Sequence, residues 1–91
     1  MRITERMLEL QVDRLNELTG SPMAYFDEAT KKINIGHHTL SGAYGGWQLQ
    51  RVTSDGGGVE ALLSHGHIPK RELYNLITSY ISGIEAGKGE R

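Results

Sequence analysis

The stretch from residue 69 to residue 84, PKRELYNLITSYISGI, decides the fold class of this chain. Pro69 is favoured in the first turn of a helix, so we predict one helix from Pro69 to about Ala86. Its apolar residues recur at helical spacing and form one stripe: Leu73, Leu76, Ile77, Tyr80 and Ile84. A helix with one apolar stripe has one face to bury, so it packs on other elements.

A second amphipathic helix is predicted at the other end, from Thr4 to Thr19. Thr4 is a suitable N-cap, and Gly20 followed by Ser21-Pro22 ends the helix. Its apolar stripe contains Leu8, Val12 and Leu15, widened by Met7, Leu18 and Leu10. Acidic residues recur along the opposite side, at Glu5, Glu9, Asp13 and Glu17, which is typical of a solvated face. We expect burial of Leu8, Leu15, Leu73, Ile77 and Tyr80.

The segment between the helices has strand character. We predict strands at 23–27 and 32–35, joined by a polar turn at 28–31, with 39–43 extending the second strand past a bulge at Gly36. Tyr44-Gly45-Gly46-Trp47 is predicted to be a tight turn before a third strand, Trp47 to Thr53. The three glycines 56–58 indicate a loop, and 59–63 fits either one short turn or a strand.

These elements predict an α+β fold. The expected order is helix, three-stranded antiparallel meander, Gly-rich loop and helix, with both helices on one sheet face. Residues 1–86 would form a single domain and residues 87–91 a flexible C-terminal tail.

Composition bounds the function classes. The formal net charge is -1 and the chain has no cysteine, so it lacks the basic excess of a typical nucleic-acid binder and cannot use disulfides or thiolate metal sites. No apolar run approaches the ~18 residues of a membrane span, and the first residues lack the apolar centre of a signal peptide. We expect a soluble protein that stays in the cytoplasm.

The first candidate site is the stretch 33–50, which contains no Lys, Arg, Asp or Glu. Tyr44 and Trp47 lie there among glycines, and flat rings beside an accessible backbone suit a ligand surface. The alternative, which we favour, is a hairpin whose aromatic residues cover a small core.

The second candidate is an anion site at the start of the last helix, where free N–H groups and the helix dipole attract negative charge. The residues that would hold a phosphate or carboxylate are His65, His67, Lys70 and Arg71, with a flexible loop at Gly56, Gly57 and Gly58 to close over it. Against this, cations in a first turn often only face water. The glycines are also not a P-loop, because the GK[ST] ending is missing.

Metal binding and catalysis have little support. His37 and His38 are adjacent, so on a strand they would point to opposite faces, and His65-Gly66-His67 lacks a third ligand. The chain has no cysteine nucleophile, no Gly-x-Ser-x-Gly elbow and no HExxH motif. We therefore expect no cofactor, no metal and no enzymatic activity.

Three motifs carry a resemblance: Ala43-Tyr44-Gly45-Gly46, Gly56-Gly57-Gly58-Val59 and the run 68–74, IPKRELY. With the opening Ile-Thr-Glu and the Leu-Thr-Gly-Ser-Pro helix stop, the chain resembles a group of small proteins encoded in tailed-phage and prophage genomes. The resemblance covers nearly the whole chain and supplies no functional residue. It implies an accessory protein in the host cytoplasm, acting by binding, for instance in defence evasion.

The leading interpretation is therefore a non-catalytic phage or prophage binding module for a host protein or a phosphate-bearing ligand. The runner-up is a phosphate-binding module for RNA or DNA, because the element order matches the double-stranded RNA-binding domain in outline, with Lys70 and Arg71 at the start of its last helix. A homodimer is also predicted, since Tyr74 and Ile81 form a second apolar strip that needs a cover.

Overall fold

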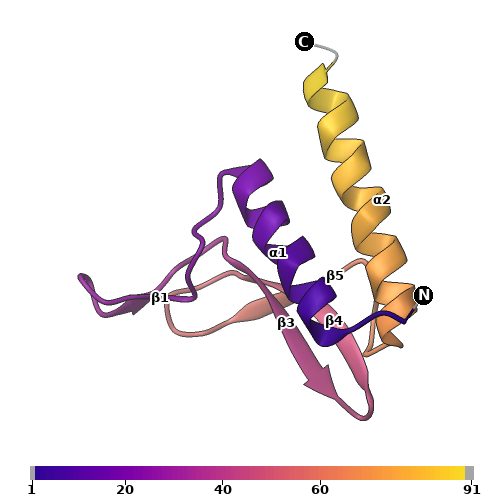
Figure 1. Cartoon of the computed structure of the whole chain (residues 1–91). Helices are drawn as coiled ribbons and strands as arrows, with labels where there is room; N and C mark the ends of the chain where they lie inside the picture. Colours follow the sequence, from indigo (N-terminus) through magenta and orange to yellow (C-terminus); the bar gives the residue numbers. More distant parts are fainter. Residues whose placement is uncertain (1, 90–91) are drawn as a thin grey trace.

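The computed structural model describes residues 2–89 and shows an α+β fold, as the sequence predicts (Figure 1). In chain order the elements are α1 (Glu5–Thr19), β1 (Phe26–Asp27), β2 (Lys32–Ile33), β3 (His38–Ala43), β4 (Gly46–Val52), β5 (Val59–Leu62) and α2 (Lys70–Gly89). Neither helix in this part of the chain combines the length and the apolar content that crossing a membrane requires.

Helix α1 has the ends that its sequence predicts. The Thr4 hydroxyl accepts a hydrogen bond from the Met7 N–H at 3.2 Å, which satisfies one of the free donors of the first turn. Gly20 takes the left-handed conformation with φ 68°, and its N–H bonds to the carbonyls of Asn16 and Glu17. A side chain is rarely found in this conformation, so glycine is the residue that ends the helix here.

The main sheet is an antiparallel meander of β3, β4 and β5. Strands β3 and β4 are joined by Tyr44 and Gly45, with φ of 53° and 74°, the conformation of a type I′ turn. The turn is thus one residue earlier than predicted, and Gly46 already belongs to β4. After β5, Ile68 returns to the same edge of β4 and pairs with Trp47.

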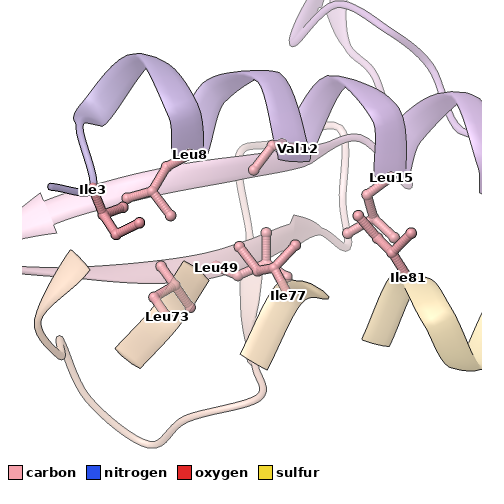
Figure 2. Close-up of a cluster of buried hydrophobic side chains, with 8 residues drawn as sticks. All are labelled: Ile3, Leu8, Val12, Leu15, Leu49, Leu73, Ile77 and Ile81. Atoms are coloured by element: carbon pink, nitrogen blue, oxygen red, sulfur yellow. The ribbon is translucent and has the colours of Figure 1, made fainter. Parts of the chain in front are cut away.

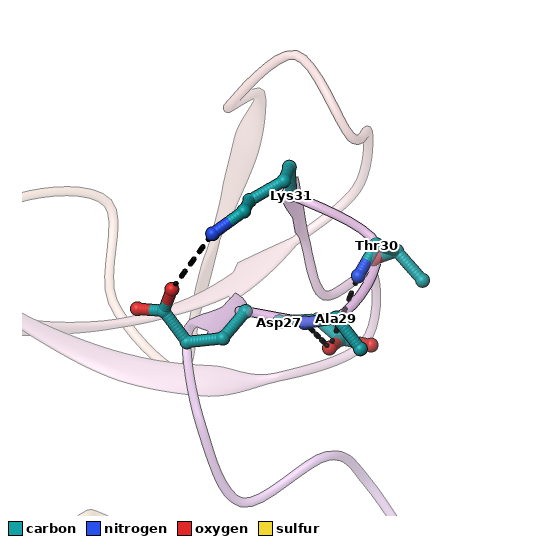
Figure 3. A network of polar contacts seen from close by, with 5 residues as sticks. Asp27, Ala29, Thr30 and Lys31 are labelled. Carbon is teal, nitrogen blue, oxygen red and sulfur yellow. Dashed lines mark hydrogen bonds and ion pairs between the residues drawn. The ribbon is translucent and has the colours of Figure 1, made fainter.

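The strands predicted at 23–27 and 32–35 do not join this meander. They contribute only the two-residue strands β1 and β2, which pair with each other as a separate hairpin. Figure 3 shows its turn, in which the Asp27 carboxylate accepts hydrogen bonds from the N–H groups of Ala29 (2.8 Å) and Thr30 (3.4 Å). Gly36, with φ 94°, separates β2 from β3, so residues 39–43 form their own strand rather than an extension.

Both helices pack on the same face of the sheet, as predicted, and share one core (Figures 1 and 2). The core consists of Ile3, Leu8, Val12, Leu15, Leu49, Leu73, Ile77 and Ile81. Leu49 comes from the central strand and is fully buried beneath the two helices. The burial predicted for Leu8, Leu15, Leu73 and Ile77 is confirmed.

The burial predicted for Tyr80 is wrong, because this side chain is 37% exposed. Ile81 takes its place with 7% exposure, and Tyr74 packs partly buried against the core. The buried stripe of α2 therefore follows Leu73, Ile77 and Ile81, at i, i+4 spacing. The strip that motivated the homodimer is covered within the chain, so the homodimer stays a prediction without that argument.

Helix α2 runs to Gly89, so the predicted tail is helical over residues 87–89. The Lys88 ammonium donates to the Leu18 carbonyl, and Arg14 pairs with Glu85 at 2.9 Å, which ties the last turns of α2 to α1. Residues 90 and 91 of the predicted tail lie outside the described part of the chain.

Candidate functional site

The start of α2 lies beside the β3–β4 turn. Trp47 N–H donates to the Ile68 carbonyl at 2.7 Å and Ile68 N–H donates back at 2.8 Å, so the chain enters α2 at this end of β4. Lys70 lines a shallow hollow together with Gly45, Gly46 and Trp47. Of the predicted anion-site residues, only Lys70 lines this hollow.

The loop Gly56–Gly58 lies at the other end of the sheet, which corrects its predicted role over the start of α2. Residues 53–55 connect it to the end of β4, and Thr53 N–H donates to the Gly58 carbonyl at 2.8 Å. A Cβ on Gly57 would lie 3.5 Å from the Ile33 side chain, so this loop packs beside the β1–β2 hairpin. Because β4 separates the loop from Lys70, the glycines do not close over an anion held there.

The predicted histidines are not among the residues that line this hollow. The His67 Nε2 lies 3.0 Å from the Ser41 hydroxyl, and its ring meets Tyr44 edge to face at 6.2 Å. His65 is exposed. Arg71 is also exposed, and it has an interaction partner.

Tyr44 and Trp47 do not form one aromatic surface. Trp47 is on the same side of β4 as Leu49, packs against the core and lies over Gly42, where a Cβ would be 3.1 Å from its ring. Tyr44 is 100% exposed at the tip of the turn, next to His67. The alternative to a ligand surface, a hairpin whose aromatic residues cover the core, therefore describes Trp47 but not Tyr44.

Asn16 organises a buried polar cluster under the first residue of β3. Its Oδ1 accepts hydrogen bonds from the His38 N–H at 2.7 Å and the His38 Nδ1–H at 2.9 Å, and its Nδ2 donates to the His38 carbonyl at 3.1 Å. His37 lies beside this cluster, with its Nδ1 3.5 Å from the Asn16 Nδ2 and 2.8 Å from the Pro22 carbonyl. A carbonyl only accepts, so Nδ1 of His37 carries the hydrogen.

These contacts leave both histidines with structural roles. Burial lowers the pKa of His38 from its usual value of 6.5, and the positive charge of Arg51 and neighbouring His37 lower it further. Within residues 2–89 no three His, Asp or Glu side chains gather in a way that would hold a metal ion. The cluster thus fixes the start of β3.

A groove runs between α1 and β3, and the sequence did not predict it. Its floor contains Val12, Leu40 and Trp47, and its rim on α1 is acidic, with Glu5, Glu9 and Asp13. Arg6 is the single cation among its lining residues. The signal was present as acidic residues at i, i+4 spacing, but the same pattern is expected of a face that only meets water.

The outer edge of β3 lies along this groove and is partly unpaired. Both backbone groups of His38 point away from β4, because they bond to Asn16. The direction alternates along an antiparallel strand, so the N–H and C=O groups of Leu40 and Gly42 also point outward. Within residues 2–89 no hydrogen bond reaches the outward N–H and C=O groups of Leu40 and Gly42.

The opposite edge of the sheet is less suited to pairing. Strand β5 has only four residues, and Leu63 follows it with φ 71°, which turns the chain away from an extended path. No residue of β5 lines the groove described above. The edge of β3 is therefore the one that combines open backbone groups with a lined cleft.

Comparisons of the chain with protein-family models, with curated proteins and with solved structures give no match. The function is therefore argued from the geometry of this groove and edge.

Proposed function

We propose that this protein is a non-catalytic binding module that takes an extended segment of a partner protein as a further strand beside β3. The observation that carries the proposal is the outward-facing, unpaired backbone of Leu40, which lines the groove, and of Gly42, two residues further along β3. An exposed strand edge is a template for another chain, and extended peptides are commonly bound in this way.

The groove adds contacts to the side chains of a bound segment, which the backbone of β3 alone does not provide. Backbone hydrogen bonds give affinity for any extended segment, whereas the neighbouring helix gives contacts to its side chains. Here the added strand would lie beside β3 with α1 above it, and Leu40 and Trp47 offer half-buried apolar surface in the groove. A segment in this place would thus contact both β3 and α1.

Charge supports a protein partner over a nucleic acid. A phosphate backbone is held by clustered cations, and the groove rim instead carries Glu5, Glu9 and Asp13. The element order and Lys70 beside the β3–β4 turn are the features in favour of the RNA- or DNA-binding alternative. That alternative requires binding of short RNA or DNA that weakens steeply with salt and depends on Lys70.

The resemblance of the sequence motifs to phage and prophage proteins extends the proposal to the setting. A small accessory protein of this kind would act in the host cytoplasm, and its partner would be a host protein. A segment of a host protein bound at β3 would be withheld from its own partners, which fits a role in defence evasion.

The proposal is tested with a short synthetic peptide that alternates threonine and lysine. We expect its addition to shift the amide resonances of residues 39–43. In two further versions the backbone nitrogens are methylated at odd or at even positions. Because only every second N–H of an added strand faces β3, one version should lose binding and the other should keep it. Equal binding of both versions, or shifts confined to other residues, would contradict strand addition.

A further inference from the structure

The rim of the groove carries a row of carboxylates that make no ion pair within the described part of the chain. Glu5, Glu9 and Asp13 follow at i, i+4 spacing on α1, so they lie on one side of the helix above β3. The ion pairs of residues 2–89 involve other side chains. Arg6 is the single cation beside them in the lining.

Like charges four residues apart on a helix repel each other, and removing either one normally stabilises the helix slightly. Repulsion in the free protein is therefore relieved when cations enter the groove. Glu17 continues the row along α1 but does not line the groove, so it provides an internal comparison.

A second copy of this chain is a poor occupant of the edge. Two β3 strands pairing side by side about a twofold axis would place both α1 helices on the same face of the joined sheet, next to each other. Their acidic rims would then meet across the seam. Like charges brought together in this way oppose association, so the rim protects the edge from self-pairing.

We infer that the segment bound at β3 is basic and presents lysine or arginine at alternate positions toward Glu5, Glu9 and Asp13; this inference rests on the function proposed above. Successive side chains of a strand point to opposite faces. Every second residue of the added strand therefore lies under α1, within reach of the carboxylates. The residues between them lie on the helix-free face, beside the polar side chains of Thr39 and Ser41.

The experiment compares three peptides with the same alternating threonines, in which the other positions are lysine, glutamine or glutamate. Binding is followed through the amide resonances of residues 39–43. We expect the lysine peptide to bind best, the glutamine peptide about three- to tenfold more weakly, and the glutamate peptide not measurably. Raising the salt concentration should weaken only the lysine peptide appreciably.

Variants of the protein test the same point from the other side. The double substitution Glu9→Gln/Asp13→Asn keeps the shape of the rim and should bring the lysine peptide to the level of the glutamine peptide. The matched control, Glu17→Gln, removes a charge from the same helix outside the groove and should leave binding unchanged. In Glu9→Lys/Asp13→Lys the preference should reverse toward the glutamate peptide.

The two proposals fail in different ways. If lysine and glutamine peptides shift residues 39–43 equally, and the double variant changes nothing, the basic partner is wrong while strand addition stands. If the lysine peptide leaves these resonances unmoved, both proposals are wrong.

Discussion

At the scale of single residues, Asn16 makes the backbone hydrogen bonds that a neighbouring strand would normally make. Its amide bonds to both the N–H and the C=O of His38, as one residue of a paired strand would, and the side chain is completely buried. The same oxygen accepts the Nδ1–H of His38, which fixes the neutral imidazole in one tautomer. The polar groups at the start of β3 are thus satisfied without a further strand.

The lowered pKa of His38 predicts a stability that depends on pH. In the unfolded chain the imidazole takes up a proton as the pH falls through about 6.5, whereas the folded protein resists this until a lower pH. The unfolded state therefore binds more protons in this window. We expect the contribution of His38 to the free energy of unfolding to be greatest above pH 6.5. This contribution should fall as the pH drops from 6.5 to the pKa of His38 in the folded protein, and it should level off below that pKa.

Urea unfolding at a series of pH values measures this dependence. The substitution His38→Gln should reduce the slope below pH 6.5, and the exposed His65→Gln should keep it. An unchanged slope in His38→Gln would show that His38 does not contribute to it.

At the scale of secondary structure, the β3–β4 hairpin depends on glycine where backbone segments meet. Gly46 is buried, and a Cβ there would lie 2.9 Å from the carbonyl carbon of His67 and 3.0 Å from the Ile68 nitrogen. These atoms belong to the backbone that pairs with Trp47 and leads into α2, so they cannot turn aside as a flexible side chain would.

Replacing Gly46 with alanine should destabilise the protein by about 1–3 kcal/mol, because the Trp47–Ile68 pairing must shift to admit the methyl group. Gly66→Ala is the matched control, since no atom lies within 4 Å of its added Cβ, and it should change stability by less than about 0.5 kcal/mol. Chemical unfolding of both variants measures the difference. Equal stability of the two would mean that the close approach at Gly46 is not needed.

The sequence predicts the helices better than the strands, for a physical reason. Thr4, Gly20 and the periodic leucines act within one helix, so the local pattern contains the information. The position of a strand depends on partners far along the chain, as when β5 pairs with β4 across the glycine loop. On α2, the choice between Tyr80 and Ile81 needed the angle at which α1 packs, which periodicity does not supply.

The same limit applies to the candidate site. Local signals singled out Lys70, which does line a hollow beside the turn, but could not show that Gly56–Gly58 lies at the far end of β4. The edge of β3 became visible only with the pairing register, because the outward direction of Leu40 and Gly42 follows from their partners.

At the scale of the whole molecule, one core joins all the larger elements. Leu49 of β4 is fully buried against both helices, and it belongs to the same cluster as residues from α1 and α2 (Figure 2). A small domain with one shared core is expected to unfold in a single cooperative step.

The variant Leu49→Ala should therefore lose about 2–5 kcal/mol of stability and still unfold in one transition. Tryptophan fluorescence reports on Trp47 in the sheet, and far-ultraviolet circular dichroism reports mainly on the helices. The two signals should change together. Leu10→Ala, at a position that is 51% exposed, should cost much less. Separate transitions would show that the sheet and the helices do not share one core.

The hydrogen bonds between Asn16 and His38 would also limit how long a segment stays bound at β3. If a segment pairs with β3 as proposed, it would find only the outward groups of Leu40 and Gly42, and each backbone hydrogen bond would contribute a net ~0.5–1.5 kcal/mol. A ladder this short, helped by a few contacts in the groove, corresponds to a dissociation constant of roughly 10–100 µM. With an ordinary association rate of about 10⁶ per molar per second, the bound segment would leave after roughly ten to a hundred milliseconds. The protein would then sample many partners in turn and hold none of them for long.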